Sequence, residues 1–383
     1  MFLLHLALTI AAIHLSVPLA YYAYLGRYVN KPWDLQTDDR YTPALTIIVP
    51  TYNEAVLVQD RLDNVVQQSY PRGKIEIIVV DSASDDGTVQ FVTRWASENR
   101  RVRLKVLEES FRRGKSIALN LALEHVSSDS DLVVFTDVDC AWRTDALRNA
   151  VRYISDPIVG GVTCSIFAPT QGTSSFEATY RDLSNYVRIS ESKLWSTPIA
   201  HGPFVLFRRE VLSKIGGIPS WTGADDSGPA SLMGFIGYRC IQAPDVVAYE
   251  YVPESMAENV TRRIRRAQHL IQNFTRTRKR AMTMSTHVPR KFDRVFILEA
   301  FMHAVNPWLL VLAVMLFALD CTATFTAGPH LVTLTLALLT LLFFPSSRAW
   351  ILTQVILAYA SIKNLFKEER IWKPVRRTRV SYT

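Results

Sequence analysis

Short apolar runs alternate with amphipathic stretches between about residues 43 and 290, whereas both ends of the chain are almost continuously apolar. Three of the short runs, at 45–49, 75–80 and 132–135, are rich in β-branched residues and have the length of buried strands. Strands that lack polar alternation are typical of a parallel sheet covered by helices on both faces. The pattern therefore predicts an α/β fold for this part of the chain.

Helical spacing fills the intervals between these strands. Residues 54–68 place Leu57, Leu62 and Val65 on one face, and residues 85–98 and 115–125 have the same kind of pattern. We therefore predict three helices that alternate with the strands.

The N-terminal apolar stretch, residues 2–24, has about the ~20 residues that a membrane-spanning helix needs. A cleaved signal peptide is the alternative, but no basic region precedes the stretch and no clear small-residue cleavage site follows it. Arg27 and Lys31 come next, which predicts that the following segment lies on the cytoplasmic side.

Three apolar stretches near the C-terminus, at 295–319, 331–344 and 349–366, precede a basic tail. If all three crossed the membrane, the tail would lie outside, against the tendency of basic segments to remain inside. Residues 349–366 mix apolar and polar side chains, so this stretch is a candidate for the membrane interface, and the number of spans stays open. The predicted organisation is an anchor at 1–26, a soluble domain at 43–290, transmembrane or interfacial helices at 291–370 and a basic cytoplasmic tail at 371–383.

Composition changes this picture in one respect. The chain has 383 residues and a formal charge of +8, but eleven Lys and Arg residues with a single acid fall within 262–294. Such a cluster suits phosphates, nucleic acid or anionic lipid headgroups. The four cysteines are far apart in the sequence, so they suggest neither a disulfide framework nor a zinc site.

Polar clusters follow each predicted strand directly, at 50–54, 81–88 and 136–139. In open α/β sheets, ligands bind at the carboxyl ends of the strands. We therefore expect the three clusters to converge on one binding site at that edge of the sheet.

Asp137 and Asp139 are one residue apart at a predicted strand end. Two carboxylates this close repel one another unless a cation lies between them, and hard oxygen ligands suit Mg²⁺ or Mn²⁺. Such an ion would also bind diphosphate oxygens. The alternative is a solvated turn, in which Asp is common.

Other side chains in these clusters suggest a nucleotide and a general base. The Asp81 carboxylate can accept hydrogen bonds from a base or a ribose, and Tyr52 can offer a ring face to a nucleobase. Asp225 and Asp226 are adjacent acids, one of which could remove a hydroxyl proton while the other orients it or raises its pKa. The alternative for this pair is an ordinary turn.

Basic residues near these clusters are candidates for phosphate binding. Lys115 follows Arg112 and Arg113 before a predicted helix, where an exposed basic loop is the alternative. Arg263 and Arg266 belong to the run at 262–266, whose guanidinium groups could bind phosphate oxygens or lie on a membrane surface.

Taken together, the motifs resemble the family 2 glycosyltransferases of GT-A fold, in particular the membrane-embedded branch that includes hyaluronan, chitin and cellulose synthases. The resemblance covers about residues 44–270. The residues that carry it are Pro50-Thr-Tyr-Asn-Glu54, Asp81-Ser-Ala-Ser-Asp-Asp-Gly-Thr88, Gly114-Lys115 with Ala118-Leu-Asn120, Asp137-Val-Asp139 and Ala224-Asp-Asp226.

This resemblance implies a Rossmann-like, mainly parallel sheet and assigns roles to single residues. Pro50, Tyr52, Glu54 and Asp81 would bind the nucleoside of a nucleotide-sugar donor, a UDP-sugar rather than a GDP-sugar. Asp137 and Asp139 would bind the diphosphate through Mg²⁺ or Mn²⁺, with Asp139 the more direct ligand. Asp226 would be the base of a single displacement that inverts the anomeric centre and gives a β-linkage.

Two departures from the family pattern concern the acceptor. Relatives carry Gln-x-x-Arg-Trp after the base, whereas this chain has Arg262-Arg-Ile-Arg-Arg266 followed by Ala267, without the tryptophan. After the acidic pair it reads Ser227-Gly-Pro-Ala230 where relatives often have Asp-Leu-Ala.

We therefore expect a multi-pass hexosyltransferase of the cell membrane that adds one or a few sugars to a lipid-linked or saccharide acceptor, with a processive polysaccharide synthase as the alternative. A non-catalytic scaffold would normally have lost Asp137, Asp139 or Asp226. Apolar flanks and an acidic pocket argue against a nucleic-acid partner.

Overall fold

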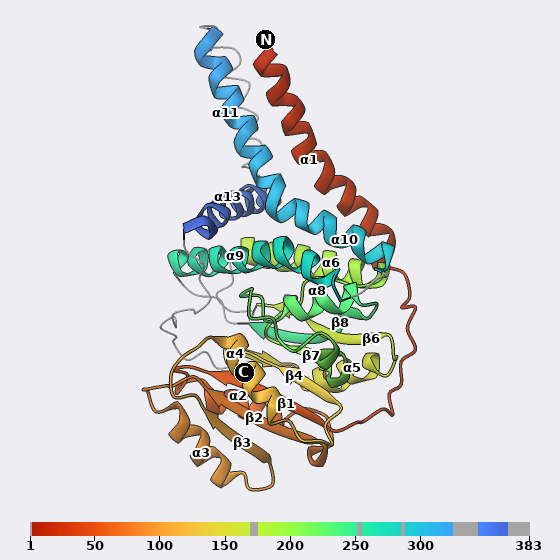
Figure 1. The fold of residues 1–383 in the computed structure, drawn as a ribbon, viewed down its shortest axis with the longest axis vertical. Coiled ribbons are helices and arrows are strands. Elements are labelled where there is room, and N and C mark those ends of the chain that lie inside the picture. The colour runs from red at the N-terminus through yellow and green to blue at the C-terminus, as the bar shows by residue number, and fades with distance from the viewer. Residues whose placement is uncertain (1, 169–174, 251–254, 285–287, 325–343, 367–383) are drawn as a thin grey trace.

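The computed structural model describes residues 2–168, 175–250, 255–284, 288–324 and 344–366. Within these ranges the chain forms one eight-stranded sheet, a layer of helices above it, and two long helices that rise from that layer (Figure 1). The predicted tail at 371–383 and almost all of the apolar stretch at 331–344 lie outside the described residues.

The sheet confirms the predicted α/β fold with a mainly parallel core. Its strand order is β3-β2-β1-β4-β7-β6-β8-β5. The pairs β1–β2, β2–β3, β1–β4 and β6–β8 are parallel, whereas β7 and β5 pair with their neighbours in the antiparallel direction. The strands are β1 (Leu45–Thr51), β2 (Ile75–Asp81), β3 (Arg103–Glu108), β4 (Leu132–Phe135), β5 (Cys140–Trp142), β6 (Val159–Phe167), β7 (Val205–Arg208) and β8 (Arg239–Glu250).

Helices cover both faces of the sheet, as the continuous apolar strands predicted. On one face lie α2 (Val58–Val66), α3 (Thr88–Glu98) and α5 (Ala146–Ile154), and on the other lie α4 (Lys115–Glu124), α7 (Arg209–Lys214) and α8 (Ser227–Phe235). Alternate side chains of β1 enter the two cores, so Ile47 packs on one face and Ile48 on the other.

Strand β3 was not among the predicted strands, because its sequence gives no apolar run. Arg103 and Lys105 alternate with Leu104 and Val106, and no residue of the strand is fully buried. It lies at the edge of the sheet, next to β2. Charged side chains of this kind are common on edge strands, where they discourage pairing with another chain.

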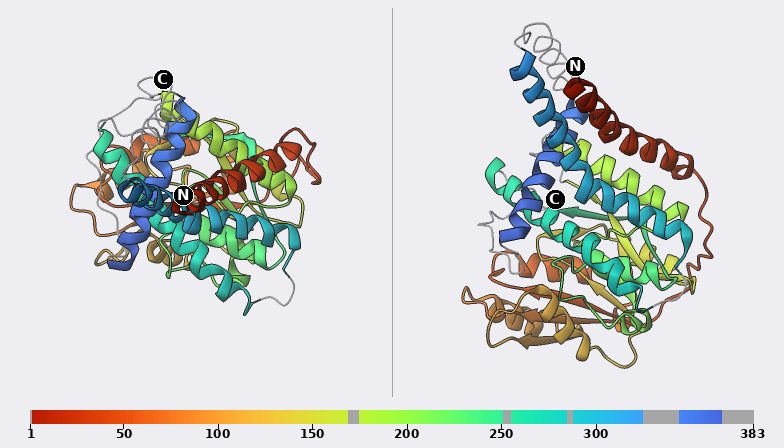
Figure 2. Two further views of the ribbon diagram at one scale, coloured as in Figure 1. Left: turned by 90° about the horizontal axis from the view of Figure 1, so that it is seen from above. Right: turned by 45° about the horizontal axis from the view of Figure 1, so that its top comes forward.

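A second layer separates the sheet from the apolar helices. It contains α6 (Ser175–Leu194), α9 (Met256–Ala281) and α10 (Arg290–Ala300). A π-helical turn at Phe301–Val305 continues α10 into α11 (Asn306–Thr324), which rises beside α1 (Phe2–Val29) in both Figure 1 and Figure 2. The last described helix, α13 (Pro345–Phe366), lies across α9 instead.

Three helices in the described part of the chain are long and apolar enough to cross a membrane. They are Phe2–Val29, Arg290–Cys321 and Ser347–Phe366. The third is fixed to α9 by Asn364, which accepts hydrogen bonds from Gln268 and Gln272 at 3.0 Å and donates to the Gln268 carbonyl.

A buried ionic cluster connects the rising helices to the layer below. Arg188 of α6 pairs with Glu191 at 2.8 Å and with Glu299 of α10 at 2.9 Å, and both carboxylates are fully buried. The hydroxyl of Tyr21 in α1 donates to Glu191 over 2.6 Å. This cluster therefore joins α6 to α10 through the Arg188 guanidinium group and α1 to α6 through the Tyr21 hydroxyl.

Aromatic packing connects α8 to α10 in the same region. Phe292 is fully buried against Phe235 and Phe296, and Gly234 of α8 lies directly under its ring. A Cβ atom at Gly234 would lie 2.2 Å from the Phe292 ring.

We expect Gly234→Ala to destabilise the protein by about 1–3 kcal/mol, because the added methyl group would force the Phe292 ring out of a filled core. Thermal unfolding of the detergent-purified protein measures this. Gly73→Ala is the matched control, since a Cβ there meets nothing within 4 Å. An equal change in melting temperature for the two variants would contradict the packing argument.

Candidate active site

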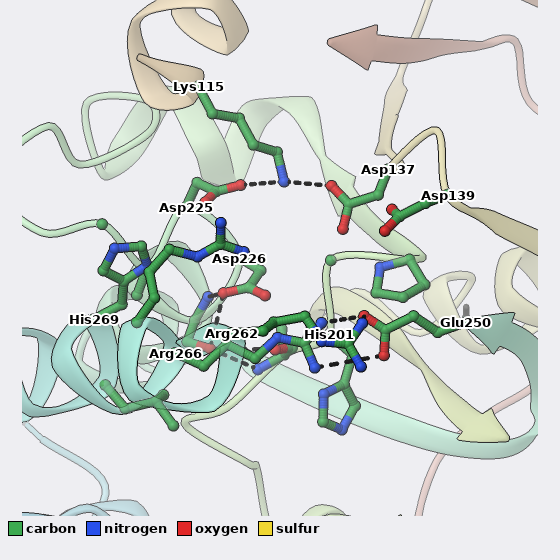
Figure 3. A pocket seen from close by; sticks show the side chains of 18 of the residues that line it. Lys115, Asp137, Asp139, His201, Asp225, Asp226, Glu250, Arg262, Arg266 and His269 are labelled. Carbon is green, nitrogen blue, oxygen red and sulfur yellow. Dashed lines mark hydrogen bonds and ion pairs between the residues drawn. The ribbon is translucent and has the colours of Figure 1, made fainter. Parts of the chain in front are cut away.

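One large cavity, with a volume of about 1140 Å³, lies where the predicted polar clusters meet. Its walls come from the ends of β1 and β4, the first turns of α4 and α8, and one face each of α6 and α9. Figure 3 shows Lys115, Asp137, Asp139 and Asp226 turned toward one another within it. This arrangement agrees with the prediction that the polar clusters after the strands converge at one edge of the sheet.

The loops after β1 and β2 are tied together by hydrogen bonds. The hydroxyl of Thr51 donates to Asp81 over 2.8 Å, and the backbone N–H of Asn53 donates to Ser84 over 2.8 Å. Asp81 also accepts the Ser84 hydroxyl and backbone N–H, and it is only 2% exposed. Among the predicted nucleoside residues, Pro50, Tyr52 and Glu54 line the cavity, whereas Asp81 lies behind the wall and fixes the loop.

One face of the Tyr52 ring is covered. The Arg112 guanidinium carbon lies 3.6 Å from the ring centroid, a distance typical of a cation–π contact. Both residues line the cavity. A nucleobase that reaches this end must therefore stack on the other face of Tyr52, lie against Arg112, or displace it.

Lys115 is the cation at the centre of the site. It is the first residue of α4, and its ammonium group lies 2.7 Å from Asp137 Oδ1 and 2.6 Å from Asp225 Oδ2. Burial alone would lower the pKa of Lys115, but the two carboxylates outweigh it and raise the pKa above its ordinary value. Burial likewise opposes the charge of Asp137, yet Lys115 holds the pKa of that carboxyl below its usual range.

Asp226 lies at the N-terminus of α8, where its Oδ1 accepts hydrogen bonds from the Ser227 backbone N–H (2.6 Å) and hydroxyl (3.0 Å). The other oxygen, Oδ2, faces the cavity (Figure 3). Burial, followed by the neighbouring charge of Asp225, raises the pKa of Asp226 to about 6. Because Lys115 pairs with Asp225 and not with Asp226, the two adjacent acids are in different environments.

Gly202 allows Asp137 and Asp226 to approach the same space. A Cβ atom there would lie 2.7 Å from Asp137 Oδ2 and 3.6 Å from Asp226 Oδ2. Any side chain at this position would therefore occupy the gap between the two carboxylates.

The arginine run lies on α9, and the phase of this helix decides which arginines reach the cavity. Arg262, Arg265 and Arg266 line it, together with His269 one turn further on. Arg263 is not among the lining residues; it pairs with Glu177 and lies 4.5 Å from the centroid of the Tyr180 ring, two side chains of α6 that do line the cavity. Of the two arginines predicted to bind the donor, only Arg266 is therefore part of the cavity wall.

Glu250, at the end of β8, forms ion pairs with several arginines of the cavity wall. It pairs with Arg266, with Arg181 at 3.2 Å and with Arg262 at 3.6 Å. Burial opposes its ionisation, but Arg266 and the other arginines hold the pKa of Glu250 well below its usual range. Glu250 was not predicted, because a lone acid at a strand end gives no signal in the sequence.

One face of α6 forms another wall of the cavity, and the sequence did not predict it. Its lining residues recur at helical spacing: Glu177, Tyr180, Arg181, Ser184, Asn185 and Arg188. The i, i+3, i+4, i+7 pattern of polar residues was the available signal. Nothing in the sequence connected it to the acidic clusters, which lie about 40 residues away on either side.

Comparison with known proteins adds a family to this geometry. A model described as glycosyl transferase family 2 matches residues 46–216, and one described as glycosyl transferase family group 2 matches residues 132–362. The solved structure of the mannosyltransferase PcManGT from Pyrobaculum calidifontis, in complex with GDP-Man and Mn²⁺, is 40% identical with a TM-score of 0.84. That alignment covers 96% of this chain and all of that one.

Two further relatives are more distant. The glycosyltransferase AglE of Haloferax volcanii is 29% identical over 181 residues, which are 46% of this chain and 57% of that protein. An N-acetylglucosaminyltransferase of Rhizobium sp. strain N33 is 26% identical over 300 residues, or 73% of this chain and 63% of that protein. The chain therefore spans about three fifths of the length of these two relatives.

We expect Lys115→Met to lower the free energy of unfolding by about 1–3 kcal/mol, because it leaves the partly buried carboxylates of Asp137 and Asp225 without their common cation. Thermal unfolding without added divalent ions measures the loss. Lys214→Met is the control, since Lys214 forms an exposed pair with Glu210 at 2.6 Å and should change the melting temperature little. Equal shifts for the two variants would contradict a structural role for the Lys115 bridge.

Proposed function

Because this chain belongs to the family 2 glycosyltransferases and uses a nucleotide sugar, we propose that it transfers a hexose with inversion to a lipid-linked or membrane-associated acceptor. The observation that carries this proposal is the convergence of the Asp137–Asp139 pair and Asp226 on one cavity. The pair suits a metal-bound diphosphate, and Asp226 suits the proton of an acceptor hydroxyl. Gly202, which has no side chain, leaves the space between the carboxylates of Asp137 and Asp226 open.

Asp137 and Asp139 would hold the divalent ion. Carboxylate oxygens fit Mg²⁺ or Mn²⁺, which proteins commonly hold through one or two carboxylates together with substrate phosphates. The ion would neutralise the charge that develops on the departing nucleoside diphosphate. We propose that Lys115 and Arg265 supply further positive charge to the diphosphate, since both line the cavity near the two aspartates.

Asp226 is the proposed base. The acceptor hydroxyl oxygen forms a bond to the anomeric carbon as the bond from that carbon to the diphosphate oxygen breaks, and the electron pair of that bond leaves with the nucleoside diphosphate. Oδ2 of Asp226 takes the hydroxyl proton, while Ser227 holds Oδ1. Attack opposite to the leaving group inverts the anomeric centre and gives a β-linkage from an α-linked donor.

GDP-mannose is the donor that we propose to test first. The solved mannosyltransferase was obtained with GDP-Man and Mn²⁺, and its alignment covers almost the whole of this chain. The preference for a UDP-sugar stays a prediction. Arg112 covers the Tyr52 ring at the proposed nucleoside end of the cavity. We expect its contact with the nucleobase to differ between UDP- and GDP-sugars.

We further propose that the protein is a multi-pass membrane protein with its transferase domain in the cytoplasm. Helices α1 and α11 rise together from the layer above the sheet, and Arg27 follows the apolar part of α1. Helix α13 lies across α9 and is proposed to lie in the interface instead of spanning the membrane. Addition of one or a few sugars remains our proposal over polymer synthesis, since the tryptophan that relatives carry after the base is missing from the arginine run.

Donor specificity and metal dependence can be tested without knowing the acceptor. We expect the purified protein to hydrolyse GDP-mannose slowly in the presence of Mn²⁺ or Mg²⁺, in a panel of UDP- and GDP-sugars, and Asp139→Ala to abolish this turnover. Release of the nucleoside diphosphate is the readout, with donor binding measured in parallel. If none of the donors binds even with metal, the transferase proposal fails.

The pH dependence of catalysis tests the base. Asp226 acts in its ionised form, so with a pKa of about 6 we expect kcat/KM to fall about tenfold for each pH unit below that value. Asp226→Asn should lower kcat about 10²–10⁴-fold at pH 7.5 and remove this limb of the profile. The exposed Asp182→Asn should leave the profile unchanged. A flat profile down to pH 4.5 in the wild type would contradict the assignment.

A further inference from the structure

Exposed basic side chains gather where α1 ends and α10 begins. Five of them form what we call the α1–α10 basic cluster: Arg27 and Lys31 at the end of α1, and Arg290, Lys291 and Arg294 in the first two turns of α10. None of these residues lines the cavity. Figure 1 shows both helix ends on the same side of the molecule, above the sheet. The cluster is therefore a feature separate from the candidate active site.

No acidic side chain balances the charge of the α1–α10 basic cluster. In the described part of the chain, none of its five residues forms an ion pair with an acid. The acids nearest to them in the sequence pair elsewhere. Asp34 pairs with Arg239 at 2.9 Å, and Asp293 of α10 pairs with Arg278 of α9 at 3.1 Å. The cluster is therefore a positive surface that suits an anionic partner.

Two tyrosines of α1 lie among these charges. Tyr24, Arg27 and Tyr28 share one face of the helix, and the Lys31 ammonium group lies 4.4 Å from the centroid of the Tyr28 ring. Arg27 and Arg294 both interact electrostatically with Tyr24, so side chains of α1 and α10 converge on this tyrosine. The two phenol oxygens are 3.4 Å apart, so at most one of their hydroxyl protons is used between them. Guanidinium and hydroxyl donors of this kind suit the oxygens of a phosphate.

The length of α1 indicates which phosphate these donors meet. The helix has 28 residues and is therefore about 42 Å long, close to the ~40–45 Å thickness of a bilayer with its headgroup regions. Its apolar part ends near Tyr24, and Arg27 follows within one turn. Tyrosines and basic residues are enriched at this level of membrane proteins. With α1 placed across the membrane as proposed above, Tyr24 and Arg27 lie at the depth of the lipid phosphates.

We propose that Tyr24, Tyr28, Arg27 and Arg294 bind the phosphate of an anionic phospholipid of the bilayer, at a site separate from the active site. A zwitterionic headgroup also has a phosphate, but its ammonium group would meet the basic residues of the cluster without an acidic partner. The site therefore selects lipids by their net charge. This inference rests on the proposed membrane placement and is independent of the transferase chemistry.

Native mass spectrometry of the full-length protein in detergent tests this lipid selection. The protein is titrated with phosphatidylglycerol, which carries a net negative charge, or with phosphatidylcholine, which is zwitterionic. We expect phosphatidylglycerol to bind on the order of tenfold more tightly. Because the bound phosphate would join α1 to α10, phosphatidylglycerol should also raise the melting temperature of the protein more than phosphatidylcholine does.

Paired substitutions assign the selection to this site. Arg27→Gln with Arg294→Gln should weaken phosphatidylglycerol binding by about 10–30-fold, since each basic residue near an anionic lipid contributes about fivefold. The same pair should leave phosphatidylcholine binding unchanged. Tyr24→Phe with Tyr28→Phe keeps both rings and removes both hydroxyl groups, which should reduce the affinity for phosphatidylglycerol about fivefold.

Arg72→Gln with Lys74→Gln is the matched control, because it removes two exposed charges from the short helix Arg72–Lys74 of the transferase domain. Equal binding of the two lipids, or an equal loss in this control, would overturn the proposal. Unchanged affinity in the tyrosine variant would also overturn it, since a diffuse positive surface would then be sufficient. Binding of polyprenyl phosphate without phosphatidylglycerol would do the same, because the site would then belong to acceptor recognition.

Two further measurements separate this site from the other proposals. Metal-dependent donor hydrolysis in detergent should be equal in all of these variants, because none of the substituted residues lines the cavity. Flotation with phosphatidylcholine vesicles tests the membrane placement by itself. A protein that floats and yet binds both lipids equally would keep its membrane placement and lose only the lipid site.

Discussion

The site depends on one ammonium group, that of Lys115, which is only partly exposed to solvent. Asp137, Asp225 and Asp226 come from two distant parts of the chain, and three carboxylates in a partly dehydrated cavity would repel one another. Lys115 lies within 2.7 Å of Asp137 and 2.6 Å of Asp225, so it joins the end of β4 to the loop before α8. Because Lys115 does not pair with Asp226, the bridge draws the two halves of the site together and leaves the third carboxylate with a raised pKa.

Much of the fold follows from local sequence pattern. Strands β1, β2 and β4 have continuous apolar runs because helices cover both of their faces. Since these strands are parallel neighbours, the polar residues that follow them lie at the same edge of the sheet. The alternating β3 escaped prediction because edge strands have no such requirement, and β5 to β8 were not predicted either. Residue type and strand position were thus enough to locate the centre of the site.

The walls of the site could not be predicted in the same way, because they depend on helix phase and on contacts between distant segments. In the arginine run, a rotation of about 100° per residue separates Arg263 from its neighbours, so it pairs with Glu177 of α6 and is not among the residues that line the cavity. Asp81 was predicted to bind the nucleoside; its side chain is 2% exposed, is not among the residues that line the cavity, and accepts hydrogen bonds from Thr51 and Ser84. Glu250 binds three arginines that lie on other elements, Arg181 on α6 and Arg262 and Arg266 on α9. The sequence pattern does not show that these helices meet the end of β8.

The cluster of Arg188, Glu191 and Glu299 has a consequence for how the protein can be divided. Removal of the helices that begin with α10 would take Glu299 from Arg188, which would keep only Glu191, and would uncover the aromatic side chains of α8 and α9 on which α10 packs. Loss of a buried ionic partner and of this apolar packing costs several kcal/mol, comparable with the whole stability of many domains. We therefore expect the transferase domain and the membrane helices to unfold as one cooperative unit, and a fragment that ends at residue 290 to be less stable than the same residues in the intact chain.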